Sequence, residues 1–247
     1  MVGANRIKAV KSLQNKKNRL ETGLFIVEGE KAVVELIQSG MELESLYVTG
    51  AFALKHKELL IDLDTNLLSA SVDELAKMGT YQQNDMALAV VVMPTHPPIP
   101  VDKGLHLVLD GINDPGNLGT LIRLADWYGF EQVICSADTV DCFNPKVVAA
   151  SKGSFIRIPV VYEDLKSVLA NCSIPVIGAV MEGKNAHQQP AVQHGCLVIG
   201  NESHGIRPDL LPYLSHPVTI PRFGQADSLN AAMAGAILMD ILRRTKT

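Results

Sequence analysis

The sequence predicts an α/β protein with a small first domain, residues 1–93, and a larger second domain, residues 105–247. Apolar strands and amphipathic helices alternate along the whole chain, which is the order found in α/β folds. The runs LHLVL and CLVIG in the second half are almost continuously apolar. Such strands are buried on both faces, so the second domain is expected to contain a mostly parallel sheet.

A proline-rich stretch, PTHPPIPVDKG at residues 94–104, separates the two predicted domains. Proline has a fixed φ angle and no backbone N–H, and it is therefore excluded from helix interiors and central strands. Proline-rich segments also stay extended. We therefore expect a semi-rigid linker here.

In the first domain, apolar spacing and capping residues predict the elements. Ser71, with Glu74 three residues later, has the capping-box pattern that opens a helix, and Gly79 ends that helix. Gly40 likewise marks the end of the preceding helix. The expected helices are 7–20, 31–39 and the one that Ser71 opens, and the expected strands are 25–27, 45–49 and 86–93.

In the second domain, the same criteria give a longer alternation of strands and helices. The expected strands are 105–109, 132–136, 175–180, 196–200 and 218–221. The expected helices are 118–128, 145–151, 164–171 and 228–244.

The overall charge gives no hint of nucleic acid, but the distribution of charge does. The 247 residues carry a formal net charge of −4, with 47% hydrophobic and 19% charged residues, an ordinary globular balance. The first twenty residues contain no acidic side chain. They form either the solvated face of an amphipathic helix or a patch that contacts phosphates and releases their counterions. The basic residues of this stretch are Arg6, Lys8, Lys11, Lys16, Lys17 and Arg19.

The cysteines are widely spaced, at Cys135, Cys142, Cys172 and Cys196. No CxxC pair or Cys/His cluster has the spacing of a zinc site, so no metal site is expected. The sequence has no signal peptide and no apolar span long enough to cross a membrane. We therefore expect a cytoplasmic protein with reduced thiols and no membrane partner.

Three loops of the second domain carry polar residues and glycines directly after a predicted strand. They are DGINDPGNLGTLIR at 110–123, GNESHGI at 200–206 and IPRFGQADSLN at 220–230. In a parallel α/β sheet, ligands bind beyond the carboxyl ends of the strands. No GxGxxG pattern follows a strand, and no GxxxxGK[ST] or GxSxG pattern occurs. These absences argue against a dinucleotide site, a P-loop and an α/β-hydrolase.

Taken singly, the polar residues of these loops also have purely structural interpretations. At about 100° per residue, Arg123 faces away from the buried stripe of its helix, where it could pair with Asp126 or stack on Trp127. Ser228 suits the N-cap of the last helix. Glu202 suits a solvated surface, and the asparagines suit turns.

Taken together, the three loops have the order and spacing of one family. NLGTLIRLADWYG, LVIGNESHG and TIPRFGQADSLNAAMAGAI resemble the three signature motifs of the SpoU/TrmH family, in the SPOUT class. Its members are RNA ribose 2′-O-methyltransferases that use S-adenosyl-L-methionine. The resemblance covers residues 105–244, and it implies a sheet whose C-terminal part is tied into a deep trefoil knot. The segment NRLETGLFIVEGEKAVVEL is similar, more loosely, to the small substrate-binding domain of many members.

The resemblance also implies which residues act. The catalytic positions of the family correspond to Arg123, Asn117, Glu202, Ser228 and Asn230. The cofactor-binding positions, which act mainly through backbone groups, correspond to Gly200, Asn201, Ile220, Leu229 and Ser228. The basic N-terminus suits an RNA-binding helper domain, with contacts expected from Lys8, Lys11, Lys16, Lys17 and Arg19.

The third motif departs from the usual family pattern at a few positions. Arg222 stands where an apolar residue is more common. Ala231, Ala232 and Met233 replace a commoner valine–serine pattern. These differences affect what is expected of the pocket wall and the RNA path, but they leave the Ser-Leu-Asn sequence intact.

The expected substrate is ribosomal RNA rather than tRNA, because the first domain resembles those of members that act on large-subunit ribosomal RNA. The last predicted helix is also followed, up to Thr247, by no basic extension of the kind that some tRNA-modifying relatives carry. Residues 245–247 lie outside the residues that the structure below describes. Members are usually homodimers with the active site near the interface, so a homodimer is expected. The alternatives are a tRNA 2′-O-methyltransferase, a catalytically silent RNA-binding assembly factor and, less favoured by the basic N-terminus, a small-molecule methyltransferase.

Methyl transfer from a sulfonium to a hydroxyl is an in-line displacement, and alignment of the two centres alone can contribute roughly 7–11 kcal/mol. The family's proposed activator is the arginine at position 123, but a guanidinium holds its proton too tightly to act as a base. Our hypothesis is that Arg123 binds the adjacent phosphate with two hydrogen bonds and stabilises the developing negative charge. The proton then passes to phosphate or water. Asn117 and Glu202 are expected to orient Arg123 or shape the pocket, and Ser228 and Asn230 to order the loops.

Overall fold

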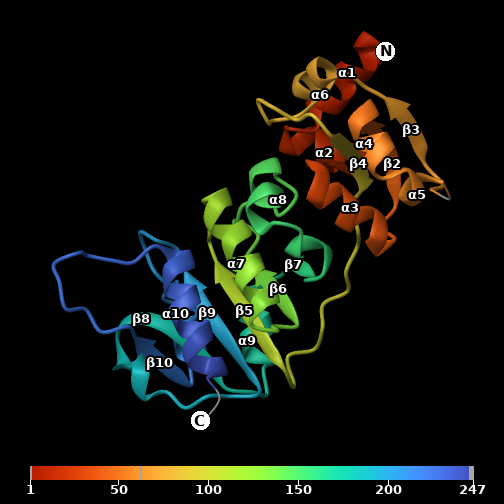
Figure 1. Ribbon diagram of the computed structural model, residues 1–247. Helices are drawn as coiled ribbons and strands as arrows, with labels where there is room; N and C mark the ends of the chain where they lie inside the picture. The colour runs from red at the N-terminus through yellow and green to blue at the C-terminus, as the bar shows by residue number, and fades with distance from the viewer. Residues whose placement is uncertain (1, 62, 245–247) are drawn as a thin grey trace. The chain divides into compact units, whose positions relative to one another are not determined.

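The computed structural model describes residues 2–61 and 63–244, which form two compact units (Figure 1). The first unit contains the residues up to Thr95 together with Phe143–Ile156. The second unit contains His96–Cys142 and the residues from Arg157 onward. Along the chain, Phe143–Ile156 falls within the predicted second domain, yet Val148 and Phe155 pack in a core cluster of the first unit.

The first unit is built on a four-stranded mixed sheet. Its strands are β1 (Leu24–Glu28), β2 (Leu43–Val48), β3 (Asn66–Ser69) and β4 (Ala87–Val92). The order is β1-β4-β2-β3, in which β4 is antiparallel to both neighbours and β3 is parallel to β2. Successive residues of β1 and β4 pack in two different apolar clusters, because side chains alternate between the faces of a strand.

Helices cover this sheet: α1 (Ala4–Ser12), α2 (Lys16–Thr22), α3 (Glu30–Ser39), α4 (Gly50–Lys55), α5 (Lys57–Leu60), α6 (Val72–Met78), α8 (Pro145–Ser151) and the 3₁₀ turn η1 (Ser154–Ile156). The prediction of a single helix at 7–20 is wrong, because the helix is interrupted between Ser12 and Lys16. The side chain of Asn15 accepts a hydrogen bond from the backbone N–H of Lys17 at 2.9 Å and so starts a second helix. The capping box at Ser71 is confirmed.

The second unit is built on a six-stranded sheet in which every pairing is parallel. Its strands are β5 (Leu105–Asp110), β6 (Gln132–Cys135), β7 (Val160–Tyr162), β8 (Val176–Asn185), β9 (Gly195–Gly200) and β10 (His216–Thr219). The order is β10-β8-β9-β5-β6-β7, which confirms the predicted parallel sheet. The predicted linker is fixed to this unit at Ile99, whose backbone N–H and C=O both bond the side chain of Gln132.

Helices lie on both faces of the parallel sheet (Figure 1). They are α7 (Pro115–Trp127), α9 (Leu165–Ala170) and α10 (Ala231–Arg243), with 3₁₀ turns η2 (Ala186–Gln188) and η3 (Leu211–Tyr213). On one face α10 packs closely on α7, where a Cβ added to Gly235 would lie 2.5 Å from Leu121 Cδ2, so a larger residue would require the Leu121 side chain to move. On the other face α9 packs in the cluster that contains Val198. No helix among the described residues is long and apolar enough to span a membrane.

Two helices of the second unit begin at residues other than those predicted. α7 begins at Pro115, so the Pro-Gly pair is the first turn of the helix and not a loop before it. Its N-cap is Asp114. α10 begins after Asn230, whose Oδ1 accepts the backbone N–H groups of the second and third helical residues at 3.0 and 3.2 Å. The start predicted at Ser228 is therefore wrong.

Candidate active site

The three motif loops meet at the carboxyl ends of the central strands. β5 ends at Asp110 and β9 ends at Gly200, and these two residues are partners in the sheet register. α7 begins within the first of these segments, at Pro115, and α10 follows the third (Figure 1). This is the edge of a parallel sheet at which ligands are expected to bind.

One chain of hydrogen bonds joins the three loops. Asn117 Nδ2 donates to Glu202 Oε1 at 2.5 Å, and Asn230 Nδ2 donates to Asn117 Oδ1 at 2.8 Å. The backbone N–H of Asn117 donates to Asp114 Oδ1 at 2.8 Å, which fixes the first turn of α7. Three of the predicted catalytic residues therefore meet in one place, and Asn117 uses both ends of its amide to hold them.

Arg123 lies outside this hydrogen-bonded cluster. It comes six residues after Asn117, about 120° around the helix and about 9 Å along it. Its side chain is exposed, and among the described residues no hydrogen bond or ion pair involves it. Asp126, one expected partner, pairs instead with Arg157 at 2.7 Å. Arg123 is thus available to a substrate group, and Asn117 and Glu202 join the loops rather than contact it.

The second loop is a rigid turn formed around Gly200 and Asn201. A Cβ added to Gly200 would lie 2.1 Å from the carbonyl carbon of Gly205, so a larger residue does not fit. Asn201 and Gly205 exchange two backbone hydrogen bonds, at 3.1 and 2.8 Å. The Asn201 side chain donates to Gly111 O at 2.7 Å and accepts the N–H of Ser203 at 2.8 Å. This predicted cofactor-binding residue therefore also ties the second loop to the first.

An ion pair between a buried carboxylate and a half-exposed arginine, which sequence reasoning missed, connects the same loops. Asp110 is 1% exposed. Its Oδ2 accepts the backbone N–H of Arg207 at 2.8 Å, and its Oδ1 lies 2.5 Å from Arg207 Nη2. This contact raises the pKa of Arg207. Asp138 lies 3.7 Å from the same guanidinium, and its pKa is lowered chiefly by a hydrogen bond from Ser136 and further by the charge of Arg207.

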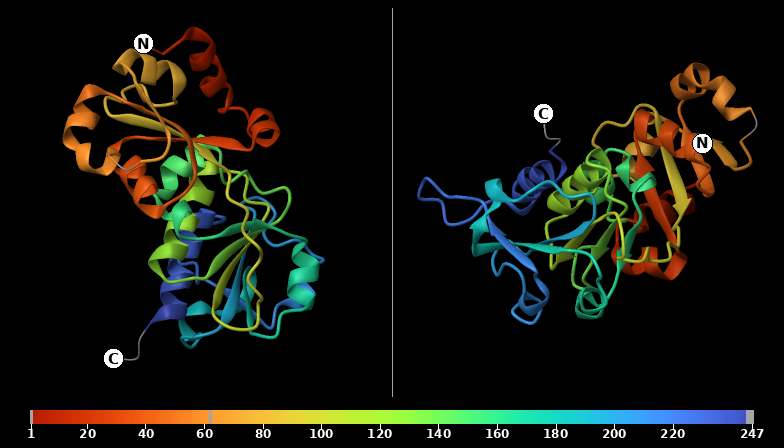
Figure 2. Two further views of the ribbon diagram at one scale, coloured as in Figure 1. Left: turned by 90° about the vertical axis from the view of Figure 1, so that its right-hand side faces the viewer. Right: turned by 90° about the horizontal axis from the view of Figure 1, so that it is seen from below.

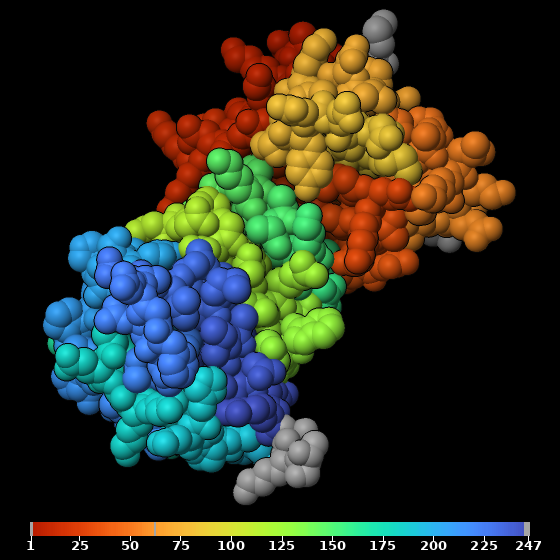
Figure 3. Space-filling model, turned by 60° about the vertical axis from the view of Figure 1, so that its left-hand side comes forward, coloured from red at the N-terminus to blue at the C-terminus, as the bar shows by residue number. Residues whose placement is uncertain are grey.

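Residues 221–229 of the third loop project from the second unit between β10 and α10 (Figure 2), and their side chains lie on its surface (Figure 3). Ser228 is exposed, Leu229 is 49% exposed, and Ile220 is half-buried where the loop begins. Among the described residues, no backbone–backbone hydrogen bond involves residues 221–229. Arg222 Nη1 donates to Ala226 O at 3.3 Å. Most of the other N–H and C=O groups of this loop are therefore available to a bound molecule, as the predicted backbone contacts require.

In the first unit, the expected RNA contacts divide into two kinds. Four of them are exposed on α1 and α2: Lys8, Lys11, Lys16 and Lys17. Arg19, in contrast, is 1% exposed, and its Nη1 donates to the carbonyl oxygens of Leu13 and Gln14, each at 2.9 Å. This burial corrects the prediction for Arg19, which holds the connection between α1 and α2 instead of facing RNA.

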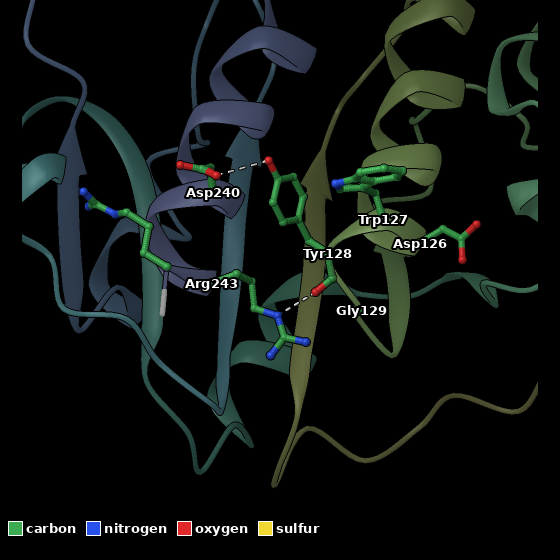
Figure 4. A pocket seen from close by; sticks show the side chains of 7 residues that line it. Asp126, Trp127, Tyr128, Gly129, Asp240 and Arg243 are labelled. Atoms are coloured by element: carbon green, nitrogen blue, oxygen red, sulfur yellow. Dashed lines mark hydrogen bonds between the residues drawn. The ribbon is translucent and has the colours of Figure 1, made fainter. Parts of the chain in front are cut away.

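A separate pocket lies at the opposite ends of α7 and α10 (Figure 4). Its volume is about 550 Å³, and it is lined by Asp126, Trp127, Tyr128, Gly129, Asp240, Arg243 and Arg244. Arg243 Nε donates to Tyr128 O at 2.6 Å, which joins the two helix ends. None of the predicted site residues lines this pocket, so it is not part of the candidate active site.

Two family models match the chain. The SpoU rRNA Methylase family matches residues 104–240, and the MRM3-like substrate binding domain matches residues 4–89. The chain belongs to the SpoU rRNA methylase family. This confirms the family inferred from the three motifs, and the second match confirms the substrate-binding type of the N-terminal part.

Several curated relatives match this SpoU-family chain over almost its full length. A 23S rRNA (guanosine(2553)-2'-O)-methyltransferase, RlmP, from Bacillus subtilis is 32% identical, with 96% of each chain covered. A 23S rRNA (uridine(2479)-2'-O)-methyltransferase from Streptomyces viridochromogenes is 30% identical, with 94% of this chain and 87% of the relative covered.

Solved structures of similar chains share the whole fold. A putative RNA methyltransferase of the TrmH family from Porphyromonas gingivalis has a TM-score of 0.87 at 33% identity, with 98% of each chain covered. The AdoMet-bound rRNA methyltransferase from Sinorhizobium meliloti has a TM-score of 0.89 at 25% identity, with 98% of this chain and 96% of that chain covered. The predicted fold class is thereby confirmed, while the trefoil knot itself stays a prediction.

Proposed function

We propose that this SpoU-family protein transfers a methyl group from S-adenosyl-L-methionine to a ribose 2′-hydroxyl of ribosomal RNA. The observation that carries the proposal is the hydrogen-bonded cluster of Asn117, Glu202 and Asn230, which joins all three family motifs at the ligand-binding edge of the sheet. The full-length 23S rRNA methyltransferase relatives support ribosomal RNA as the substrate. The AdoMet-bound relative supports the cofactor.

The second and third loops fit S-adenosyl-L-methionine. Its adenine and methionine parts need hydrogen-bonding partners, and most backbone groups of residues 221–229 make no hydrogen bond to the backbone of the protein itself. Leu229 and Ile220 add an apolar surface. We assign the cofactor to Gly200, Ile220 and Leu229, with Asn201 and Ser228 beside them. The bound cofactor supplies an electrophilic methyl group on a sulfonium.

The exposed arginine of α7 is assigned to the RNA. Arg123 has a planar guanidinium, which binds a phosphate through two parallel hydrogen bonds. Held beside the target ribose, it stabilises negative charge on the 2′-oxygen as the proton leaves for phosphate or water. Asn117, Glu202 and Asn230 keep the three loops in one arrangement, so that the two reacting centres are aligned before reaction.

The first unit is assigned to binding the RNA around the target nucleotide. Lys8, Lys11, Lys16 and Lys17 are exposed on adjacent helices and suit phosphate contacts. The 2′-hydroxyl distinguishes RNA from DNA, and here it is also the acceptor of the methyl group. We also propose a cytoplasmic location, where the free cysteines would stay reduced.

We further propose a homodimer formed through the exposed face of α7 and α10. Trp127 is 81% exposed and Met233 is 60% exposed, although both side chains are large and apolar. Such side chains on a surface suit a protein interface. Light scattering is expected to give twice the mass of one chain for the wild type and the mass of one chain for Trp127→Glu. A monomeric wild type would contradict the dimer.

The proposed function is tested with total RNA from a strain that lacks the gene. The RNA is incubated with the protein and radiolabelled S-adenosyl-L-methionine and then separated by size. Label in large-subunit ribosomal RNA is expected, and label in the tRNA fraction would select the tRNA alternative. Absence of cofactor binding, measured by calorimetry, would contradict the enzyme assignment and favour the catalytically silent alternative.

Arg123→Lys tests the assigned role of the arginine. Lysine keeps the charge but not the planar fork, so turnover is expected to fall roughly 100-fold while cofactor affinity is unchanged. Arg157→Lys is the matched control, because Arg157 is bound to Asp126 and lies outside the motif loops. Near-normal turnover in Arg123→Lys would show that two parallel hydrogen bonds to phosphate are not required.

A further inference from the structure

Two cysteines of the second unit bring their sulfur atoms together. Cys172 Sγ lies 3.5 Å from Cys196 Sγ. Cys172 is in the connection between α9 and β8, and Cys196 is the second residue of β9. Neither residue is part of the motif loops, because β9 reaches the site only at its other end, Gly200.

The backbone around the pair favours bond formation. Cys196 donates its N–H to Pro175 O at 2.9 Å, and Val176 is its partner in the sheet register, so the chain leading from Cys172 into β8 is held beside β9. A disulfide requires a sulfur–sulfur distance of about 2.05 Å, so the two atoms must approach by roughly 1.5 Å. Cys172 lies in neither a helix nor a strand, and its segment can supply this small movement without breaking a ladder.

The two thiols differ in exposure and in acidity. Cys172 is partly exposed, and its pKa is lowered because the Cys196 thiol donates a hydrogen bond to its sulfur. Cys196 is buried, and its pKa is raised by the same hydrogen bond and by burial. A reagent from solution therefore meets Cys172 first, and the lowered pKa of Cys172 favours the more reactive thiolate. Cys196 stands behind it as the second thiol.

We propose that Cys172 and Cys196 form an oxidation site that closes to an intramolecular disulfide in the presence of hydrogen peroxide. The Cys172 sulfur attacks a peroxide oxygen, the O–O bond breaks, and a sulfenic acid and one water form. The Cys196 sulfur then attacks the Cys172 sulfur, the S–S bond forms, and the S–O bond breaks. The hydroxide that leaves takes the Cys196 proton as a second water, so two electrons pass from the thiols to the peroxide.

The disulfide would protect the protein as well as cross-link it. A sulfenic acid that meets a neighbouring thiol forms a disulfide and is not oxidised further to the irreversible sulfinic acid. The bond also ties the start of β9 to the chain before β8 and restricts the unfolded chain. Oxidised protein is therefore expected to unfold at a temperature several degrees above that of reduced protein.

The test uses the full chain, reduced and then treated with hydrogen peroxide. After alkylation and digestion without reductant, mass spectrometry is expected to find one peptide pair linked through Cys172 and Cys196, and a thiol reductant is expected to reverse the link. Cys172→Ser and Cys196→Ser should each abolish it. Cys142→Ser is the matched control and should retain it, because Cys142 is a buried cysteine outside the pair.

The peptide map of the wild-type protein can also refute the proposal, and it does not depend on the folding of any variant. Sulfinic acid at Cys172 with no linked peptide would overturn the proposal, and so would alkylation of both thiols after peroxide treatment. A link between two different chains would overturn it as well. An unfolding temperature that does not rise on oxidation would overturn the stabilising effect.

Discussion

Replacement of Asn117 by Asp changes the hydrogen-bonded cluster with almost no change in shape. In the wild type, Asn117 Nδ2 donates to Glu202 Oε1 at 2.5 Å. In Asn117→Asp an oxygen takes the place of that donor, so that two carboxylates face each other. Asn230 Nδ2 still finds the oxygen to which it donates. The variant therefore loses one contact and gains one repulsion.

The size of the effect follows from the burial of the two side chains. A hydrogen bond to a charged group contributes about 1.5–3 kcal/mol. Asn117 and Glu202 are both half-buried, and solvent screening favours the lower end of that range. The contact orders the second loop, which is assigned to the cofactor, so a loss of about 1.4 kcal/mol corresponds to roughly tenfold weaker cofactor binding.

Calorimetric titration with S-adenosyl-L-methionine measures this effect, and urea unfolding measures the accompanying loss of stability. Glu202→Gln alone keeps an acceptor oxygen and is expected to change little. The double variant N117D/E202Q exchanges donor and acceptor, because the new amide can donate to the new carboxylate. Most of the lost affinity should therefore return. Unchanged binding in N117D, or no recovery in the double variant, would refute the role given to this contact.

Three further changes probe the other parts of the account. Lys11→Ala combined with Lys16→Ala should weaken the salt dependence of RNA binding. The magnitude of the slope of log K against log salt concentration, measured by filter binding, is expected to fall by about 1.4. Gly200→Ala should abolish cofactor binding by calorimetry, because its Cβ would lie 2.1 Å from a backbone carbon. Arg207→Ala should cost about 2 kcal/mol in urea unfolding, because the carboxylate of Asp110, 1% exposed, keeps only its backbone donor.

Each of these changes has a control within the chain. Lys103→Ala with Lys166→Ala removes the same charge from the second unit, and an equal loss of slope there would mean that α1 and α2 are not the RNA-binding surface. Gly224→Ala lies in the third loop with nothing within 4 Å of its added Cβ, so it should bind cofactor normally. A stable Arg207→Ala would mean that the buried carboxylate does not depend on the guanidinium.

The sequence predicted the parallel sheet because buried parallel strands are recognisable from short apolar runs such as LHLVL and CLVIG. The strand-end rule for parallel sheets predicted that the three loops carry the site. The resemblance to the SpoU/TrmH family then implied that Asn117, Glu202 and Asn230 belong to it. The sequence could not separate Ser228 from Asn230 as the N-cap of α10, because both residue types are good caps. Only the path of the loop decides which side chain reaches the first free N–H groups.

Other features depend on contacts that are distant along the chain. Arg19 shares the basic stretch with the exposed lysines, and only packing shows that its guanidinium satisfies the carbonyl groups between α1 and α2. Asp110 and Arg207 are 97 residues apart in the sequence. They meet because β5 and β9 are neighbours in the sheet, where Asp110 is paired with Gly200. The short elements α4, α5 and β3 were missed, because four to six residues carry too little periodicity to be recognised.

The central claim concerns the product, and identification of the methylated nucleoside tests it most directly. RNA labelled by the protein is digested to nucleosides, which are separated and identified by mass spectrometry. The account predicts that the label is found in a 2′-O-methyl nucleoside of ribosomal RNA, and that Arg123→Ala yields almost none. Label in a nucleoside methylated on its base, or equal labelling by Arg123→Ala, would contradict ribose methylation by this site.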